Sequence, residues 1–94
     1  EDGLINWHEN SRYIYNWIRA LTKPYTGAFS YVDGKKIMIW SARESFDRRK
    51  GMPGQIIDYV PSGLLVSTKS KNIVLTEFEC ENNYKPQVGD LFQS

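Results

Sequence analysis

The chain has few of the residues that usually build a chemical site. Its 94 residues include one cysteine, Cys80, and one histidine, His8. A lone cysteine cannot form an internal disulfide, which fits the reducing conditions of the cytoplasm. The flanking Glu79 and Glu81 disfavour a reactive thiolate, and His8 has no cysteine or second histidine with which to hold a metal ion. We therefore expect a cytoplasmic protein with neither a catalytic thiol nor a metal centre.

Long apolar runs are missing too. No run approaches the roughly 18 apolar residues that span a bilayer, and no charged-then-apolar leader opens the chain. The sequence therefore predicts no membrane partner and no secretion signal. The first residues are Glu1 and Asp2, not methionine, so we expect an excised piece of a longer protein.

Known catalytic patterns are equally scarce. There is no Gly-x-Ser-x-Gly elbow, no phosphate-binding loop, and no set of cysteines and histidines at metal-binding spacing. Glu77 and Glu79 share one face of an expected strand, where two carboxylates are more often a solvated face than an acid/base pair. The chain alone is therefore not expected to be a complete enzyme. These residues do not show whether it forms part of one.

Charge is unevenly spread along the chain. The net charge is +1, yet residues 12–71 hold eleven Lys/Arg against four Asp/Glu, a balance of +7, and each flanking segment carries −3. A basic centre can attract phosphate groups. The alternative is that a compact fold disperses these charges over all its sides.

A helix followed by a sharp turn is expected near the front. Apolar residues recur at helical spacing after a capping Asn10 or Ser11. Pro24 prevents the helix from continuing because it has no N–H, and Gly27 gives the backbone the freedom to turn. The residues expected on the buried helix face are Ile14, Trp17, Ile18 and Leu21.

Short strands fill the rest of the chain. An alternating hairpin has Asp33-Gly34, a favoured two-residue turn, at its tip. Polar residues 41–53 are expected to form a long loop, and residues 82–94 a loosely structured tail held by Val88, Leu91 or Phe92.

We predict a mainly β fold with one α-helix, a small OB-like barrel of about five to six strands. The expected division is a linker segment (1–9), the barrel (10–80) and a tail (81–94). Further strands are expected at Gln55–Val60, Leu64–Thr68 and Ile73–Glu79.

Because no catalytic pattern is present, binding is the function left to consider. The sequence offers cations interleaved with aromatic residues for it. Basic loops track phosphates and aromatic rings stack on bases in proteins that bind single-stranded nucleic acid. The alternative is that the rings pack the core and the cations only keep the surface soluble. The candidates for phosphate or RNA contacts are Lys35, Lys36, Arg43, Arg48, Arg49 and Lys50.

Residues 16–43 resemble the C-terminal domain of the formyltransferases that use 10-formyltetrahydrofolate, and the likeness runs from about residue 4 to 79. That family includes methionyl-tRNA formyltransferase and the nucleotide-sugar formyltransferases. Thr26 departs from the family pattern, which has a second proline there. Asn16-Trp17 and Trp40-Ser-Ala-Arg43 look closer to the UDP-4-amino-4-deoxy-arabinose formyltransferase type than to the tRNA type. The matching motifs are Ile18-Arg19-Ala20, Pro24-Tyr25-Thr26-Gly27-Ala28-Phe29, Trp40 and Pro53-Gly54.

The resemblance implies an OB-like barrel joined to an N-terminal Rossmann-like catalytic domain. That other domain would hold the catalytic residues and 10-formyltetrahydrofolate, so no cofactor is expected in this chain. The implied function is an accessory domain of an N-formyltransferase whose acceptor is an amino group of a nucleotide-linked sugar. The alternatives are a tRNA-binding C-terminal domain, a free-standing barrel that binds nucleic acid, or an oligomerisation domain.

The resemblance also suggests where the two domains meet. Arg19, Pro24, Tyr25 and Gly27 would form a helix–turn corner that packs against the catalytic domain near the substrate cleft. The alternative is that this corner only fixes the geometry of the barrel itself, because a tight Pro/Gly turn needs no ligand to explain it.

Overall fold

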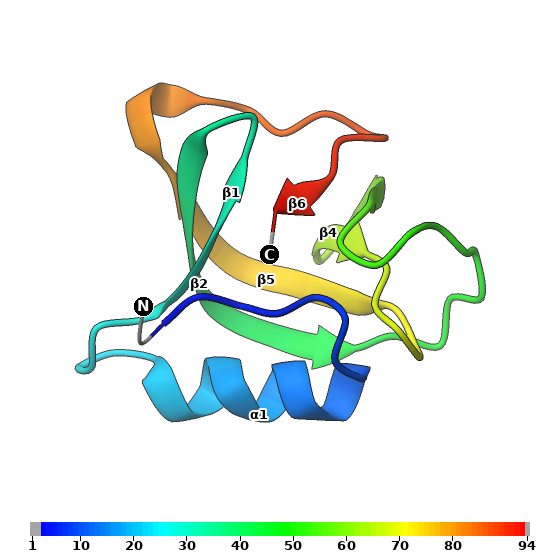
Figure 1. Ribbon diagram of the computed structural model, residues 1–94, viewed down its shortest axis with the longest axis horizontal. Coiled ribbons are helices and arrows are strands. Elements are labelled where there is room, and N and C mark those ends of the chain that lie inside the picture. Colours follow the sequence, from blue (N-terminus) through cyan, green and yellow to red (C-terminus); the bar gives the residue numbers. More distant parts are fainter. Residues whose placement is uncertain (1–2, 94) are drawn as a thin grey trace.

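The computed structural model describes residues 3–93 and consists of a curled antiparallel sheet with one helix packed against it (Figure 1). The elements are α1 (Ser11–Leu21), β1 (Ala28–Val32), β2 (Lys35–Glu44), β3 (Ile56–Val60), β4 (Gly63–Val66), β5 (Ile73–Cys80), the short 3-10 helix η1 (Glu81–Asn83) and β6 (Phe92–Gln93).

The strand order in the sheet is β3-β4-β5-β2-β1-β6, with every pair antiparallel. The sheet curls until its two ends approach each other. An isolated bridge pairs Gln55 with Leu91, and the Ile56 N–H donates to the Asp90 carbonyl oxygen at 2.8 Å. These contacts pair backbone groups that would otherwise form an open sheet edge. The prediction of a mainly β, OB-like barrel with one helix is confirmed.

Helix α1 lies across the sheet beneath β1 and β2 (Figure 1). It begins after Asn10, whose side-chain oxygen accepts a hydrogen bond from the Tyr13 N–H at 2.9 Å and so caps the first turn. Ile14 and Ile18 are buried in the core, as the spacing predicted. Trp17 and Leu21 are only partly buried and pack against the edge of the core.

Residues near both ends of the described chain meet in the core. Trp7 is fully buried, and its indole ring stacks on Phe92 with ring centroids 4.8 Å apart. The Trp7 Nε1–H donates to the Ser30 hydroxyl at 3.0 Å, and that hydroxyl donates to the Gln93 carbonyl oxygen at 2.9 Å. Ile5 is also fully buried, and its N–H donates to the Phe29 carbonyl oxygen at 2.9 Å.

The C-terminal residues are more ordered than the sequence suggested. Phe92 and Gln93 pair with Val32 and Tyr31 as β6, so the expectation of a loose structure was wrong for them. Of the three apolar residues considered there, Phe92 is buried whereas Val88 and Leu91 are exposed. A two-residue strand is too short to show alternation, so no pattern could have indicated it.

Strand β2 also runs further than expected. The polar sequence predicts a loop at 41–53, but Ala42, Arg43 and Glu44 pair with Leu75, Val74 and Ile73 of β5. The ladder shifts register around Ser41, as in a β-bulge. The bulge and the polar side chains hid the alternation. The loop after β2 therefore begins at Ser45.

Candidate functional site

The helix–turn corner is a closed turn built on hydrogen bonds. The Gly27 N–H donates to the Leu21 carbonyl oxygen at 2.8 Å, and the Tyr25 N–H donates to the Thr22 carbonyl oxygen at 3.0 Å. The Thr22 hydroxyl donates to the Trp40 carbonyl oxygen at 2.7 Å, which ties the turn to β2. The Lys23–Pro24 peptide bond is cis. The corner is thus held in place by both the helix and the sheet.

Gly27 is required at this corner for two reasons. Its φ is +91°, in the left-handed region that favours glycine. A Cβ at this position would also lie 2.7 Å from Met38 Cε and 2.8 Å from Trp40 Cζ3, so these side chains would have to shift. The chain therefore passes directly over the side chains of β2.

The structure groups three of the four predicted corner residues. Pro24 and Tyr25 are exposed and Gly27 is buried, and the Tyr25 side chain is 67% exposed. Arg19 instead contacts its helix neighbours. Its guanidinium carbon lies 5.1 Å from the centroid of the Tyr15 ring, and its Nη2 donates to Asn16 Oδ1 at 3.3 Å.

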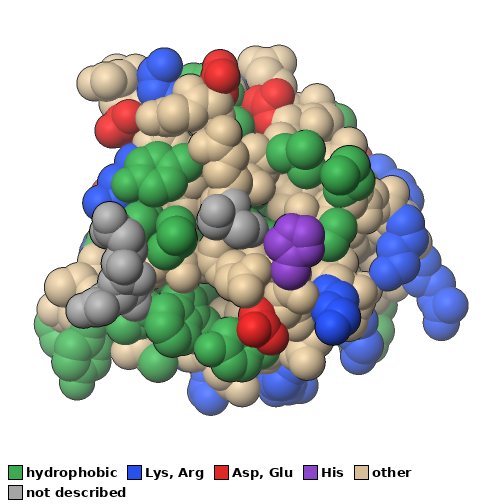
Figure 2. Space-filling view, in the orientation of Figure 1, with side chains coloured by type: hydrophobic (Ala, Val, Ile, Leu, Met, Phe, Trp, Pro, Cys, Tyr) green, Lys and Arg blue, Asp and Glu red, His purple; other side chains and the backbone are tan. Residues whose placement is uncertain are grey.

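An apolar groove runs between the N-terminal segment and α1. The exposed Tyr13 stacks on Trp17 with centroids 6.3 Å apart. Figure 2 shows hydrophobic side chains gathered at the lower left of this face, over the helix and the corner. The groove encloses about 120 Å³ and is lined by Leu4, Ile5, Asn6, Glu9, Tyr13, Ile14 and Trp17.

The six predicted basic residues occupy three separate places. Lys35 and Lys36 follow the β1–β2 turn and lie over aromatic rings; Lys36 Nζ is 4.4 Å from the Phe29 centroid. Arg43, further along β2, donates to the Ser62 hydroxyl at 2.7 Å. Arg48, Arg49 and Lys50 belong to the loop after β2, residues 45–50, which we call the basic loop. The sequence did not reveal this separation because it does not show how the strands run.

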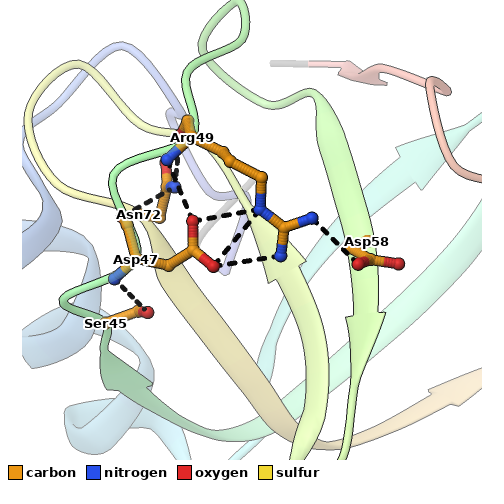
Figure 3. Close-up of polar contacts among 5 residues, drawn as sticks. All are labelled: Ser45, Asp47, Arg49, Asp58 and Asn72. Atoms are coloured by element: carbon orange, nitrogen blue, oxygen red, sulfur yellow. Dashed lines mark hydrogen bonds and ion pairs between the residues drawn. The ribbon is translucent and has the colours of Figure 1, made fainter.

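Arg49 is the best-paired cation of the basic loop (Figure 3). It forms ion pairs at 3.0 Å with both Asp47 and Asp58. Hydrogen bonds from the Arg49 side chain hold the pKa of Asp47 below its usual range, and the same contacts raise the pKa of the guanidinium. Arg49 therefore ties the loop to β3, and its charge is neutralised by its neighbours.

Asn72 holds the basic loop through hydrogen bonds from its side chain (Figure 3). It is 2% exposed, and its side-chain amide donates to the carbonyl oxygens of Asp47 and Arg49. The Ser45 N–H donates to the Asn72 carbonyl oxygen at 2.9 Å. Asn72 Oδ1 is buried, and no partner for it occurs among residues 3–93.

A cavity of about 300 Å³ lies against the basic loop. Figure 2 shows Lys and Arg side chains along the right-hand edge of the face, where this loop runs. No sequence pattern marks Phe46 or Asn72 as a site residue. The only available signal was an isolated aromatic residue in a polar stretch. The lining residues are Ser45, Phe46, Asp47, Arg48, Arg49, Lys50, Ser70, Lys71 and Asn72.

Cys80 is half-buried at the end of β5, and burial raises the pKa of its thiol. We expect iodoacetamide to alkylate it several times more slowly in the folded chain than in the urea-unfolded chain at pH 8, because less thiolate is present. Mass spectrometry of timed samples measures both rates, with glutathione in the same urea as the reagent control. A folded chain that reacts as fast as the unfolded one contradicts this prediction.

In the described part of the chain, no group of three or more acidic, histidine or cysteine side chains is placed to hold a metal ion.

Comparison with known proteins places the fold in a family. The pattern that describes the formyl transferase C-terminal domain matches residues 1–94. The chain belongs to the formyl transferase C-terminal domain family. It is 49% identical over 73 residues to the bifunctional polymyxin resistance protein ArnA of Wigglesworthia glossinidia brevipalpis, a match covering 78% of this chain and 11% of that protein. The resemblance seen in the sequence is thereby confirmed.

A solved structure with this fold is a variant of HypX from Aquifex aeolicus. It superposes with a TM-score of 0.68 over 80% of this chain and 13% of the HypX chain, at 20% identity. That likeness concerns the fold alone. The chain matches only 11% of the length of ArnA and 13% of the HypX chain. No helix in residues 3–93 is long and apolar enough to cross a membrane.

Proposed function

We propose that this chain is the C-terminal accessory domain of a cytoplasmic N-formyltransferase whose acceptor is an amino group of a nucleotide-linked sugar. The domain would dock on an N-terminal catalytic domain through the helix–turn corner. The observation that carries the proposal is the 49% identity to ArnA combined with the position of the corner. The formyl group would come from 10-formyltetrahydrofolate bound by the catalytic domain, and we assign no folate contact to residues of this chain.

The corner lies beside the point where an upstream domain would join the barrel. The Phe29 N–H donates to the Gly3 carbonyl oxygen at 2.9 Å. A Cβ on Gly3 would lie 2.5 Å from the Gly27 carbonyl oxygen, so Gly3 and Gly27 are in direct contact. A chain that reaches Gly3 therefore arrives next to the turn. A domain joined there by a short linker faces Tyr25 and the apolar groove.

The exposed side chains on this side suit a contact between domains. Tyr25 is 67% exposed and Tyr13 is 50% exposed. Tyrosine combines a large apolar ring with a polar hydroxyl, which is why it is enriched in protein interfaces. Hydrogen bonds hold the corner to both the helix and β2, which favours a small loss of conformational entropy when it docks.

The test is a Tyr25→Ala substitution in the full-length protein. We expect kcat/KM for formylation of the amino sugar to fall about tenfold, the effect of losing about 1.4 kcal/mol of contact energy at the substrate cleft. The melting temperature of the barrel should change little because Tyr25 is exposed. Steady-state kinetics and calorimetry measure the two quantities.

A matched control is Val88→Ala. Val88 is 57% exposed and belongs to the segment after η1, which runs along the top of Figure 1, away from the corner. Its activity should equal that of the unaltered protein. Equal activity of the Tyr25→Ala and Val88→Ala enzymes would show that the corner only shapes the barrel.

The tRNA alternative makes a different prediction. A domain that grips tRNA binds it with an affinity that falls steeply as salt rises, because several cations each release counterions. The six predicted basic residues lie in three different places, on the β1–β2 hairpin, beside Ser62 and in the basic loop. We therefore expect weak tRNA binding by the 94-residue chain. Micromolar, strongly salt-dependent binding in a filter assay would favour the tRNA function instead.

A further inference from the structure

The cavity against the basic loop has the chemistry of a second binding site, distinct from the corner. We propose that it binds a small phosphorylated aromatic molecule, a nucleoside mono- or diphosphate. The proposal does not depend on the formyl transfer described above, because it concerns only residues of this barrel. It joins an exposed ring, cations with no ion-pair partner among residues 3–93, and a partly open cavity at one place.

The cations that would meet the phosphate are those left without a carboxylate partner. Asp47 and Asp58 neutralise Arg49. Within residues 3–93, no ion pair involves Arg48, Lys50 or Lys71, and all three line the cavity. Lys50 Nζ donates to the Ser70 carbonyl oxygen at 2.7 Å, which fixes the ammonium in position and leaves donors for an anion.

Phe46 would meet the aromatic part of the ligand. Its side chain is 92% exposed, the largest exposure among the exposed apolar residues. The Lys71 ammonium lies 5.8 Å from the ring centroid, so ring and cation are presented together. Aromatic side chains of this kind stack on nucleobases whatever the base, because every base has a π-face. Phe46 thus supplies apolar contact beside the cations that would hold a phosphate.

The cavity is already formed before any ligand arrives. Four of the residues that line it are joined by hydrogen bonds that hold the loop in one shape. They are Ser45, Asp47, Arg49 and Asn72. Pre-organisation of this kind lowers the entropy cost of binding.

The size of the cavity favours a mononucleotide over a nucleic-acid strand. A volume of about 300 Å³ is at the small end of ligand pockets. A strand needs several cationic positions in a row, but the remaining predicted cations lie on the β1–β2 hairpin and beside Ser62. One isolated site with one exposed ring fits one base and its phosphates.

The experiment is a titration of the 94-residue chain with uridine monophosphate and adenosine monophosphate, followed by calorimetry or by shifts of backbone amide resonances. We expect dissociation constants of about 0.1–1 mM, which correspond to about 4–5.5 kcal/mol. The shifts should centre on residues 45–50 and 70–72. UDP-glucose serves as the nucleotide-linked arm, and comparison with the free nucleotides distinguishes the two sources of ligand.

Two substitutions test the roles assigned above. Phe46→Ala and Lys71→Gln should each weaken nucleotide binding about tenfold, and neither should disturb folding because both side chains are exposed. Lys36→Gln removes a cation that also lies over a ring, Phe29, but outside the cavity, and it should leave binding unchanged.

Several outcomes would overturn the proposal. They are an absence of shifts at 10 mM nucleotide, binding by Phe46→Ala equal to that of the unaltered chain, and inorganic phosphate binding as tightly as the nucleotides. Tight binding of an oligonucleotide without binding of mononucleotides would replace it with a nucleic-acid site.

Discussion

A Trp7→Ala substitution is expected to lower the free energy of unfolding by about 3–5 kcal/mol, the range for removal of a large aromatic side chain from a core. Trp7 is fully buried, stacks on Phe92 and donates its Nε1–H to the Ser30 hydroxyl. Its loss leaves a cavity between the N-terminal segment and β6. Domains of this size are stabilised by about 5–15 kcal/mol in total, so the variant should lose a large share of its stability.

Urea denaturation followed by circular dichroism measures this effect. Trp7→Phe is the matched variant, since it keeps a ring to stack on Phe92 but loses the bond to Ser30, and it should cost less than the alanine variant. Tyr13→Ala, at an aromatic position that is 50% exposed, is the control and should cost under about 1 kcal/mol. A Trp7→Ala chain within 1 kcal/mol of the original would contradict the proposed packing.

A Gly63→Ala substitution is the second change with a large expected effect, about 3 kcal/mol or more. The φ of Gly63 is +156°, which L side chains rarely adopt. An added Cβ would also lie 2.1 Å from the Leu75 carbonyl oxygen and 3.2 Å from Thr76 Cα, which are backbone atoms of β5. Backbone inside a sheet cannot move aside cheaply, so β4 must separate from β5.

Gly34→Ala is the control, because it adds the strain of a positive φ without adding a close contact. Gly34 has φ +77° at the tip of the β1–β2 hairpin, but no atom lies within 4 Å of a Cβ built there. It should cost only about 1–2 kcal/mol, the strain of the left-handed conformation. Thermal unfolding of the two variants gives the comparison. Equal losses of stability would mean that the contact with β5 adds nothing.

Much of the fold could be predicted from local chemistry. The spacing of Ile14 and Ile18, the cap at Asn10 and the stop at Pro24 depend on near neighbours, and all were confirmed. The Asp33-Gly34 turn was also confirmed, with φ of +52° and +77° at the two residues. The full length of β2 could not be predicted, because the shift at Ser41 moves the following side chains out of simple alternation.

In the candidate sites, too, local features could be predicted from the sequence and features that join distant segments could not. The turn between Pro24 and Gly27 is a local feature, so its closed geometry could be expected from the sequence. The cavity against the basic loop joins Phe46 to Lys71 and Asn72, which come from two loops separated by β3 and β4. Only the pairing of β2 with β5 brings these loops together, and no sequence pattern in either loop reports it.

The stacking of Trp7 on Phe92 has a consequence for protein synthesis. Ser30 and β1 are contacted by residues from the first and last ten positions of the described chain. While a ribosome still covers the residues around Phe92, the indole of Trp7 lacks its partner ring and the barrel cannot close. The side of β1 that pairs with β6 then stays uncovered until Phe92 and Gln93 have left the exit tunnel.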